Sequence, residues 1–251
     1  MDGRLARAPV VVLFAGAVRT VAGVRAFYVH GSLASGHYRP GISDLDLVAV
    51  VERDLDGGQR ERLADLHRTI ARDHPAAATL HCAYVPHPDV DDVDREHLVW
   101  AHGELYRRTL SGIARAEIHQ FGITVYGPPP AEVIPPVSPA ALRAAARAEL
   151  TGYWSGVVQK FEPWLQDTFV DHGLTALARA RETILTGRLT SKDEAIAGLG
   201  ALGVPPHLAR RVRLRREGHD VPLTAAERHE QAVVTRQIMI EQLGRMGTVG
   251  L

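Results

Sequence analysis

Residues 27–51 read FYVHGSLASGHYRPGISDLDLVAVV and form the most informative segment of the chain. An apolar strand pattern leads to a turn at Gly31 and Ser32, and after a polar loop a second apolar strand carries Asp44 and Asp46. Side chains two residues apart on a strand point to the same face, so the two carboxylates can share one hard divalent cation. Where the Gly-Ser turn opens a helical turn, its free backbone N–H groups suit a phosphate. The segment therefore predicts a site for a metal and a nucleotide.

The composition of the 251-residue chain excludes several classes of protein. Acidic and basic residues balance at 29 each, so a broad electrostatic surface for nucleic acid is not expected. The single cysteine, Cys82, rules out an internal disulfide framework, and no apolar run has the length of a membrane span. Arg4 and Arg7 precede the apolar run VVVLFAGAV, which resembles a short signal peptide without a convincing cleavage site. We expect a helix there, and a cytoplasmic protein.

The N-terminal half alternates between strand and helix patterns. Strands are predicted by short apolar runs at residues 25–30, 45–51, 79–85 and 122–126. Helices are predicted at residues 8–23 and 56–74, and a long helix is predicted after the acidic loop 89–94, through about residue 119.

The C-terminal half has no convincing strand pattern. A boundary at residues 128–139, which contain six prolines, precedes it. Helices are predicted at about residues 139–160, 172–187, 191–203, 206–216 and 224–243, two of them opened by the capping boxes SKDE at 191–194 and TAAE at 224–227. The fold class is therefore α+β: a mixed sheet with helices in residues 1–136 and an all-helical domain in residues 137–251.

The order of these motifs resembles a known family. An apolar strand, Gly-Ser, a spacer and Asp-x-Asp in a second strand resemble the nucleotidyltransferase superfold. Three downstream segments narrow the resemblance to aminoglycoside adenylyltransferases of the streptomycin and spectinomycin type: LAR at 177–179, LTGRL at 185–189 and SKDEA at 191–195. The resemblance implies a nucleotidyltransferase domain in residues 1–136 and a helical domain in residues 137–251 that clamps substrate and nucleotide.

The same resemblance implies roles for individual residues. Asp44 and Asp46 would be catalytic and hold Mg²⁺. The nucleotide ATP would be bound by Gly31, Ser32, Ser43, Arg179 and Lys192. Lys192 has an independent argument, because a cation in the first turn of a helix opposes the helix dipole unless an anion lies nearby. Arg179 alone reads as an ordinary exposed helix residue.

The sequence departs from the family at the third strand. The family usually places a third carboxylate there, and aligning Leu80 puts His81 at that position. A histidine can act as general base or ligate a softer metal, but it does not simply replace a hard oxygen ligand of Mg²⁺. His81 can equally be an ordinary strand residue of an inactive relative, and an acid from residues 89–94 can substitute for the lost carboxylate.

The acceptor site departs as well. Candidate substrate-binding residues are Glu104, Trp154, Asp171 and His172. Glu104 lies in a segment where the family has Gly-Glu-Trp, but leucine stands in place of the tryptophan. The aspartate that the family places three residues before His172 is Phe169 here, and Asp171 is adjacent to His172. For Trp154 the alternative is helix-packing core. His30, before Gly31, is expected to be a hydrogen-bonded structural histidine.

The leading hypothesis is a Mg²⁺-dependent enzyme that transfers AMP from ATP to a hydroxyl of a small polar acceptor such as an aminoglycoside, which would confer antibiotic resistance. One alternative is a non-catalytic nucleotide-binding relative, and another is a toxin–antitoxin type enzyme that modifies a protein or RNA. We expect a small-molecule acceptor and a nucleotide as partners, no membrane or nucleic acid, and a monomer or weak dimer.

Overall fold

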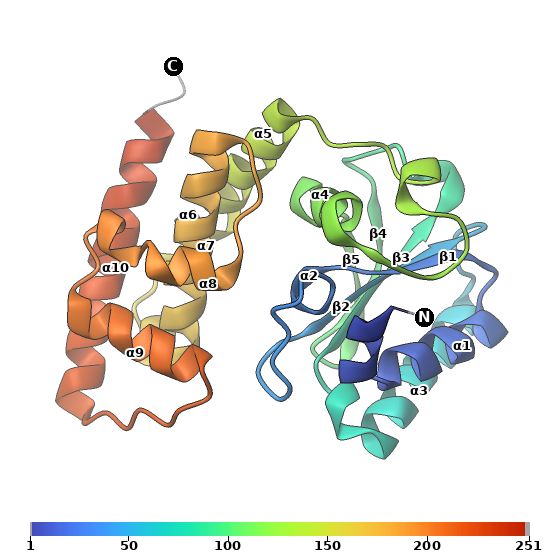
Figure 1. The fold of residues 1–251 in the computed structure, drawn as a ribbon, viewed down its shortest axis with the longest axis horizontal. Helices are drawn as coiled ribbons and strands as arrows, with labels where there is room; N and C mark the ends of the chain where they lie inside the picture. The colour runs from blue at the N-terminus through green and yellow to red at the C-terminus, as the bar shows by residue number, and fades with distance from the viewer. Residues whose placement is uncertain (1, 249–251) are drawn as a thin grey trace. The chain divides into compact units, whose positions relative to one another are not determined.

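The computed structural model describes residues 2–248. The chain divides into two compact units, Met1–Val137 and Ser138–Leu251. The first holds a six-stranded mixed sheet with helices and the second is helical in the part described, so the predicted fold class is confirmed (Figure 1). No helix among residues 2–248 is long and apolar enough to cross a membrane.

The sheet of the first unit has the strand order β5-β4-β3-β2-β1-β6. Its strands are β1 (Val24–Val29), β2 (Leu45–Val51), β3 (Leu80–Pro86), β4 (Glu96–Ala101), β5 (Glu104–Thr109) and β6 (Ile123–Tyr126). The pair β2 and β3 is parallel, whereas the other neighbours are antiparallel. Both central strands are apolar over most of their length because the sheet is covered on two faces.

Helices cover the two faces unequally, as Figure 1 shows. Leu45, Leu47 and Ala49 of β2 pack in one core with α1 (Val10–Val21) and α3 (Gly57–Asp73). Val48 and Val50 point to the opposite face and pack in a second core with Ile118 of α4 (Gly112–Phe121). Asp46 belongs to this second face by the alternation of the strand.

The single cysteine lies inside the sheet. Cys82 of β3 is fully buried and pairs with Leu47 of β2 and Trp100 of β4. Burial raises the pKa of its thiol to about 12.

The long helix predicted up to residue 119 is wrong in its first half. Residues 96–109 form the β4–β5 hairpin, and α4 begins only at Gly112. The hairpin closes through His102 and Gly103, whose φ angles of 54° and 86° are those of a tight hairpin turn. The apolar residues of β4 are buried by pairing with β3, a contact that the local pattern of EHLVWA does not reveal.

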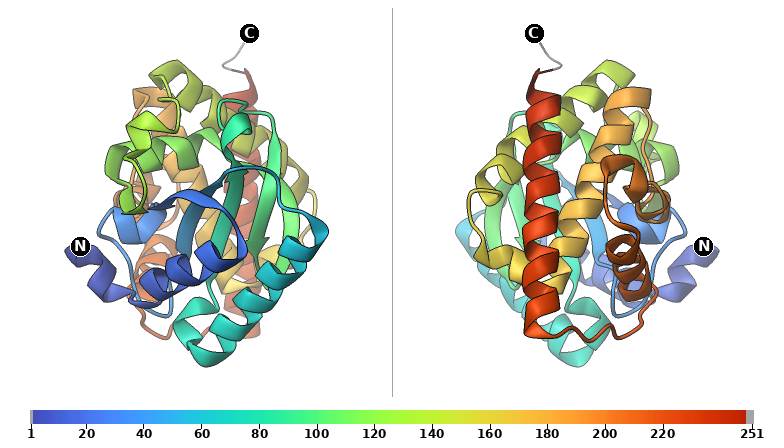
Figure 2. Two further views of the ribbon diagram at one scale, coloured as in Figure 1. Left: turned by 90° about the vertical axis from the view of Figure 1, so that its right-hand side faces the viewer. Right: turned by 90° about the vertical axis from the view of Figure 1, so that its left-hand side faces the viewer.

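The second unit consists of helices around aromatic side chains. They are α5 (Pro139–Glu149), a π-helical turn (Leu150–Trp154), α6 (Ser155–Val157), α7 (Asp167–Thr186), α8 (Lys192–Ala197), α9 (Pro206–Arg216) and α10 (Ala225–Thr248). The long helix α10 packs against α7 (Figure 2). Gly173 of α7 makes room for an aromatic ring, since a Cβ there would lie 2.8 Å from the Trp164 ring.

Several helix boundaries in this unit differ from the prediction. The predicted helix 139–160 is interrupted by the π-helical turn and ends at Val157, and α7 begins five residues before the predicted position 172. Both capping boxes are confirmed, at Ser191 with Glu194 and at Thr224 with Glu227. Short 3₁₀ turns complete the structure at Gly3–Arg7, Pro75–Ala77, His87–Asp89, Pro130–Glu132, Glu162–Leu165 and Leu199–Leu202.

Candidate functional site

Asp46 and His81 are neighbours across the parallel pair of strands. The register of β2 and β3 places their Cα atoms opposite one another, and His81 Nδ1 lies 3.8 Å from Asp46 Oδ1. Both side chains reach solvent, with 30% of Asp46 and 23% of His81 exposed. Asp44, half-buried, immediately precedes β2. The structure therefore brings the Asp46 and His81 side chains together at the start of β2 and β3, directly after Asp44.

The Gly31–Ser32 turn lies directly against Asp46. Gly31 opens the short helix α2 (Gly31–Ala34) with a φ of 63°, in the left-handed region that favours glycine. A Cβ at this position would overlap Asp46 Oδ2 and lie 3.0 Å from Asp46 Cγ. Only a glycine lets the turn approach the carboxylate so closely. Ser32, half-buried, donates a long hydrogen bond of 3.5 Å from its hydroxyl to the Asp44 carbonyl.

Ser43 closes the loop that joins α2 to β2. Its side chain is buried, its hydroxyl accepts the Arg39 N–H at 3.1 Å, and its carbonyl accepts the Thr79 hydroxyl at 3.4 Å. The structure thus gives Ser43 a role in holding Asp44 in place, and its contact with a triphosphate stays a prediction.

His30 is hydrogen-bonded, as the sequence predicted. Its Nδ1 lies 3.0 Å from Oε2 of Glu117 on α4. Burial opposes the charged imidazole, but the hydrogen bond to Glu117 and the negative charges of Asp46 and Glu117 outweigh it and raise the pKa of His30. Glu117 carried no signal in the sequence, because 87 residues separate it from His30.

His102 is a second residue that sequence reasoning missed. It lies in the β4–β5 turn, and its ring packs edge-on against His81 with centroids 4.8 Å apart. It is the one non-glycine residue with positive φ among residues 2–248. The signal available was its position next to Gly103 and Glu104, the predicted acceptor segment. Glu104 itself is exposed at the start of β5.

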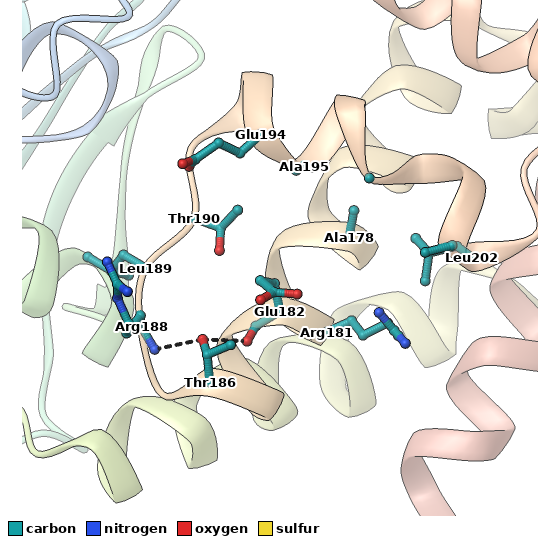
Figure 3. A pocket seen from close by; sticks show the side chains of 12 residues that line it. Ala178, Arg181, Glu182, Thr186, Arg188, Leu189, Thr190, Glu194, Ala195 and Leu202 are labelled. Atoms are coloured by element: carbon teal, nitrogen blue, oxygen red, sulfur yellow. Dashed lines mark hydrogen bonds between the residues drawn. The ribbon is translucent and has the colours of Figure 1, made fainter.

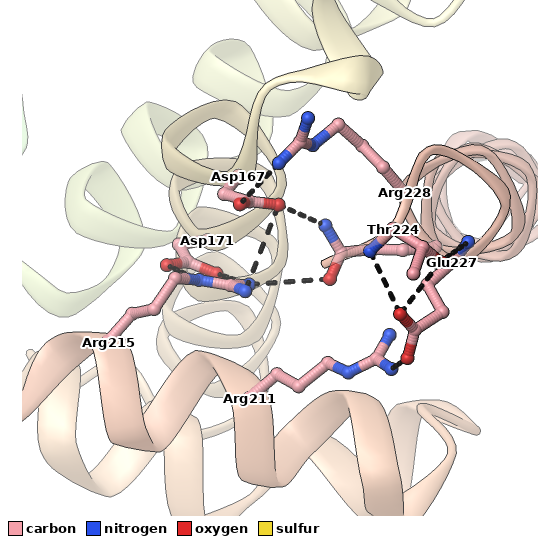
Figure 4. Close-up of polar contacts among 8 residues, drawn as sticks. Asp167, Asp171, Arg211, Arg215, Thr224, Glu227 and Arg228 are labelled. Carbon is pink, nitrogen blue, oxygen red and sulfur yellow. Dashed lines mark hydrogen bonds and ion pairs between the residues drawn. The ribbon is translucent and has the colours of Figure 1, made fainter. Parts of the chain in front are cut away.

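Two predicted acceptor residues are engaged inside the helical unit. Trp154 has no exposed surface and packs against Trp164, Phe169 and the ring of His172, so its side chain forms core. Asp171 forms a bidentate ion pair with Arg215, with distances of 2.8 and 2.6 Å (Figure 4). The contact of Trp154 and Asp171 with an acceptor stays a prediction.

The predicted nucleotide residues of the helical unit gather around His172. Loss of surrounding water lowers the pKa of this imidazole, although one side of the ring is exposed, and the positive charges of Lys192 and Arg179 lower it further. Arg179 donates from Nε to the Thr190 carbonyl at 2.8 Å, and Lys192 is the first residue of α8. The positive charges of Arg179 on α7 and Lys192 on α8 therefore act on the ring of His172.

A pocket of about 330 Å³ lies between the end of α7 and α8 (Figure 3). Its charged lining consists of Arg181, Glu182, Arg188 and Glu194, together with the hydroxyls of Thr186 and Thr190. Neither Arg179 nor Lys192 lines this pocket. Arg179 is nevertheless adjacent to it, through its hydrogen bond to the Thr190 carbonyl.

Comparison with known proteins identifies the first unit. Residues 13–94, which include β1, α2, β2 and β3, match the family model described as nucleotidyltransferase domain. Residues 13–94 thus resemble a nucleotidyltransferase domain. The fold of the chain is also similar to spectinomycin adenyltransferase AAD(9) from Enterococcus faecialis, solved with ATP and spectinomycin. The TM-score is 0.66 at 18% identity, covering 87% of this chain and 92% of that chain. A search of curated proteins found no match.

The carboxylates of the nucleotidyltransferase domain suit a hard cation. Among residues 2–248 no group of three or more His, Cys, Asp or Glu side chains is arranged to hold a metal. Two aspartates are nevertheless a suitable protein contribution for Mg²⁺, which takes its other ligands from water and from the phosphates of a substrate. Asp44 and Asp46 fit that pattern, whereas His81 supplies a nitrogen that Mg²⁺ does not favour.

Proposed function

We propose that the protein transfers AMP from ATP to a hydroxyl of a small polar acceptor, with aminoglycosides as the first class to test. The observation that carries the proposal is the packing of the Gly31 turn against Asp46 with His81 in register beside it. The nucleotidyltransferase match and the fold shared with an adenyltransferase solved with ATP support it.

The reaction requires three tasks of the chain. Asp44 and Asp46 would hold Mg²⁺, which would neutralise the charge that builds on the phosphates. His81 would accept the proton of the acceptor hydroxyl, whose oxygen then bonds to the α-phosphorus. The bond between the α-phosphorus and the bridging oxygen breaks, and pyrophosphate leaves with that oxygen. Arg179 and Lys192 are proposed as contacts to the nucleotide.

Calorimetric titration with ATP and Mg²⁺ tests the binding half of the proposal. The wild type is expected to bind, and Asp46→Asn to bind at least about tenfold more weakly because one charged ligand is lost. Asp65→Asn is the matched control, since this exposed carboxylate on α3 pairs only with Arg68 at the surface. Absence of binding, or equal binding by Asp46→Asn, would refute the proposal.

Pyrophosphate release with a panel of aminoglycosides and other polyhydroxylated acceptors tests the catalytic half. The second candidate function, a non-catalytic nucleotide-binding protein, is favoured by one observation, the histidine at position 81. If the wild type is active, His81→Ala should lower turnover by about a hundredfold, the usual contribution of a general base. If only His81→Glu turns over, the natural protein is the non-catalytic one.

A further inference from the structure

His30 is held from two sides at the entrance to the Gly31–Ser32 turn. Its backbone N–H donates to the Asp46 carbonyl at 2.9 Å, which ties it to β2. Its ring bonds to Glu117 on α4 at 3.0 Å, and only 13% and 9% of the two side chains are exposed. These two hydrogen bonds fix His30, the residue immediately before Gly31, whose backbone lies against the Asp46 carboxylate.

Burial makes a carboxylate energetically unfavourable at the position of Glu117. A carboxylate on the buried face of α4, next to Ile118 of the apolar core, gives up hydration that polar contacts must replace. Apolar residues of similar volume generally give at least as much stability at such a position. Packing of α4 against α2 therefore does not by itself explain an acid there.

We propose that Glu117 is a positioning residue that acts through His30 to hold the Gly31–Ser32 turn against Asp46. The turn is thereby preformed for the phosphates of the nucleotide, so binding does not have to order it. This inference rests on the proposed function. It assigns α4, which contributes none of the predicted site residues, a part in nucleotide affinity.

The test compares Glu117→Ala, Glu117→Gln and the control Gln120→Ala, an exposed residue on the same helix. Glu117→Ala is expected to weaken ATP binding about tenfold, because the turn must be ordered on binding. Glu117→Gln should recover most of the affinity, since its amide oxygen still accepts the His30 Nδ1–H. The Glu117 variants should keep the KM of the wild type for the acceptor. The control Gln120→Ala should keep its ATP affinity.

Two further readouts separate positioning from general stability. Amide hydrogen exchange at residues 31–35 should accelerate in Glu117→Ala at a temperature well below its Tm. If Glu117→Ala lowers the Tm but binds ATP like the wild type, or if affinity falls without faster exchange in the turn, the inference is overturned. A wild type that does not bind ATP would instead refute the proposed function on which it rests.

Discussion

Replacement of Gly31 by alanine should disable the site while leaving the fold intact. The new methyl group would overlap Asp46 Oδ2 and lie 3.0 Å from Cγ, so the carboxylate must retreat. A retreat of about 1 Å at a reacting centre is enough to cost about a hundredfold in rate. The left-handed backbone at φ 63° adds strain of about 1–2 kcal/mol, which lowers the Tm by only a few degrees.

The chain supplies a matched control for this experiment. Gly36 also has a positive φ, of 84°, but a Cβ there would meet nothing within 4 Å. Gly36→Ala should therefore show the same loss of Tm as Gly31→Ala without the loss of ATP binding and pyrophosphate release. Equal ATP affinity and turnover in the two variants would refute the reasoning, since backbone strain would then account for both.

Three other predictions concern single side chains. The buried ring of His67 has its pKa lowered by burial to about 3; because the unfolded value is about 6.5, its contribution is complete above pH 6.5 and is lost as pH falls, by about 2 kcal/mol at pH 5. His67→Phe should remove that part of the pH dependence of the unfolding free energy, measured by denaturant titration. An unchanged pH dependence in this variant would contradict the assignment. Asp171→Ala should cost about 2 kcal/mol by removing the bidentate partner of the half-buried Arg215, with an unchanged acceptor KM; a KM raised tenfold would support Asp171 as an acceptor contact. Lys192→Gln should weaken ATP binding about tenfold while Lys160→Gln, the other lysine, does not; equal affinities would exclude the predicted contact.

The sequence predicted correctly those helices and strands whose residue pattern depends only on near neighbours in the chain. The apolar runs of β2 and β3 and the capping boxes at Ser191 and Thr224 depend on neighbours within a few residues, so they were found. The β4–β5 hairpin was mistaken for helix because its strand identity depends on pairing with β3. The π-helical turn within the predicted helix 139–160 likewise has no local mark.

The residues of the candidate site likewise fall into those that local spacing predicts and those that only tertiary packing brings to the site. Gly31, Asp44 and Asp46 lie within sixteen consecutive residues, and the spacing alone predicted their association. His81 was placed by aligning Leu80 with the family pattern of the third strand, and the register of β2 and β3 puts it opposite Asp46. Glu117 and His102 were not found, because each reaches the site only through tertiary packing.

The buried thiol of Cys82 gives the protein a built-in reporter of sheet opening. A thiol-specific reagent needs an accessible thiolate, and this group is both enclosed by β2 and β4 and held protonated by its raised pKa. Labelling of the folded chain can therefore proceed only when β3 separates from its neighbours. Because His81 is next to Cys82 on β3, the labelling rate reports how often the strand that carries His81 opens. A nucleotide that binds beside His81 should lower the labelling rate of Cys82 without contacting its sulfur.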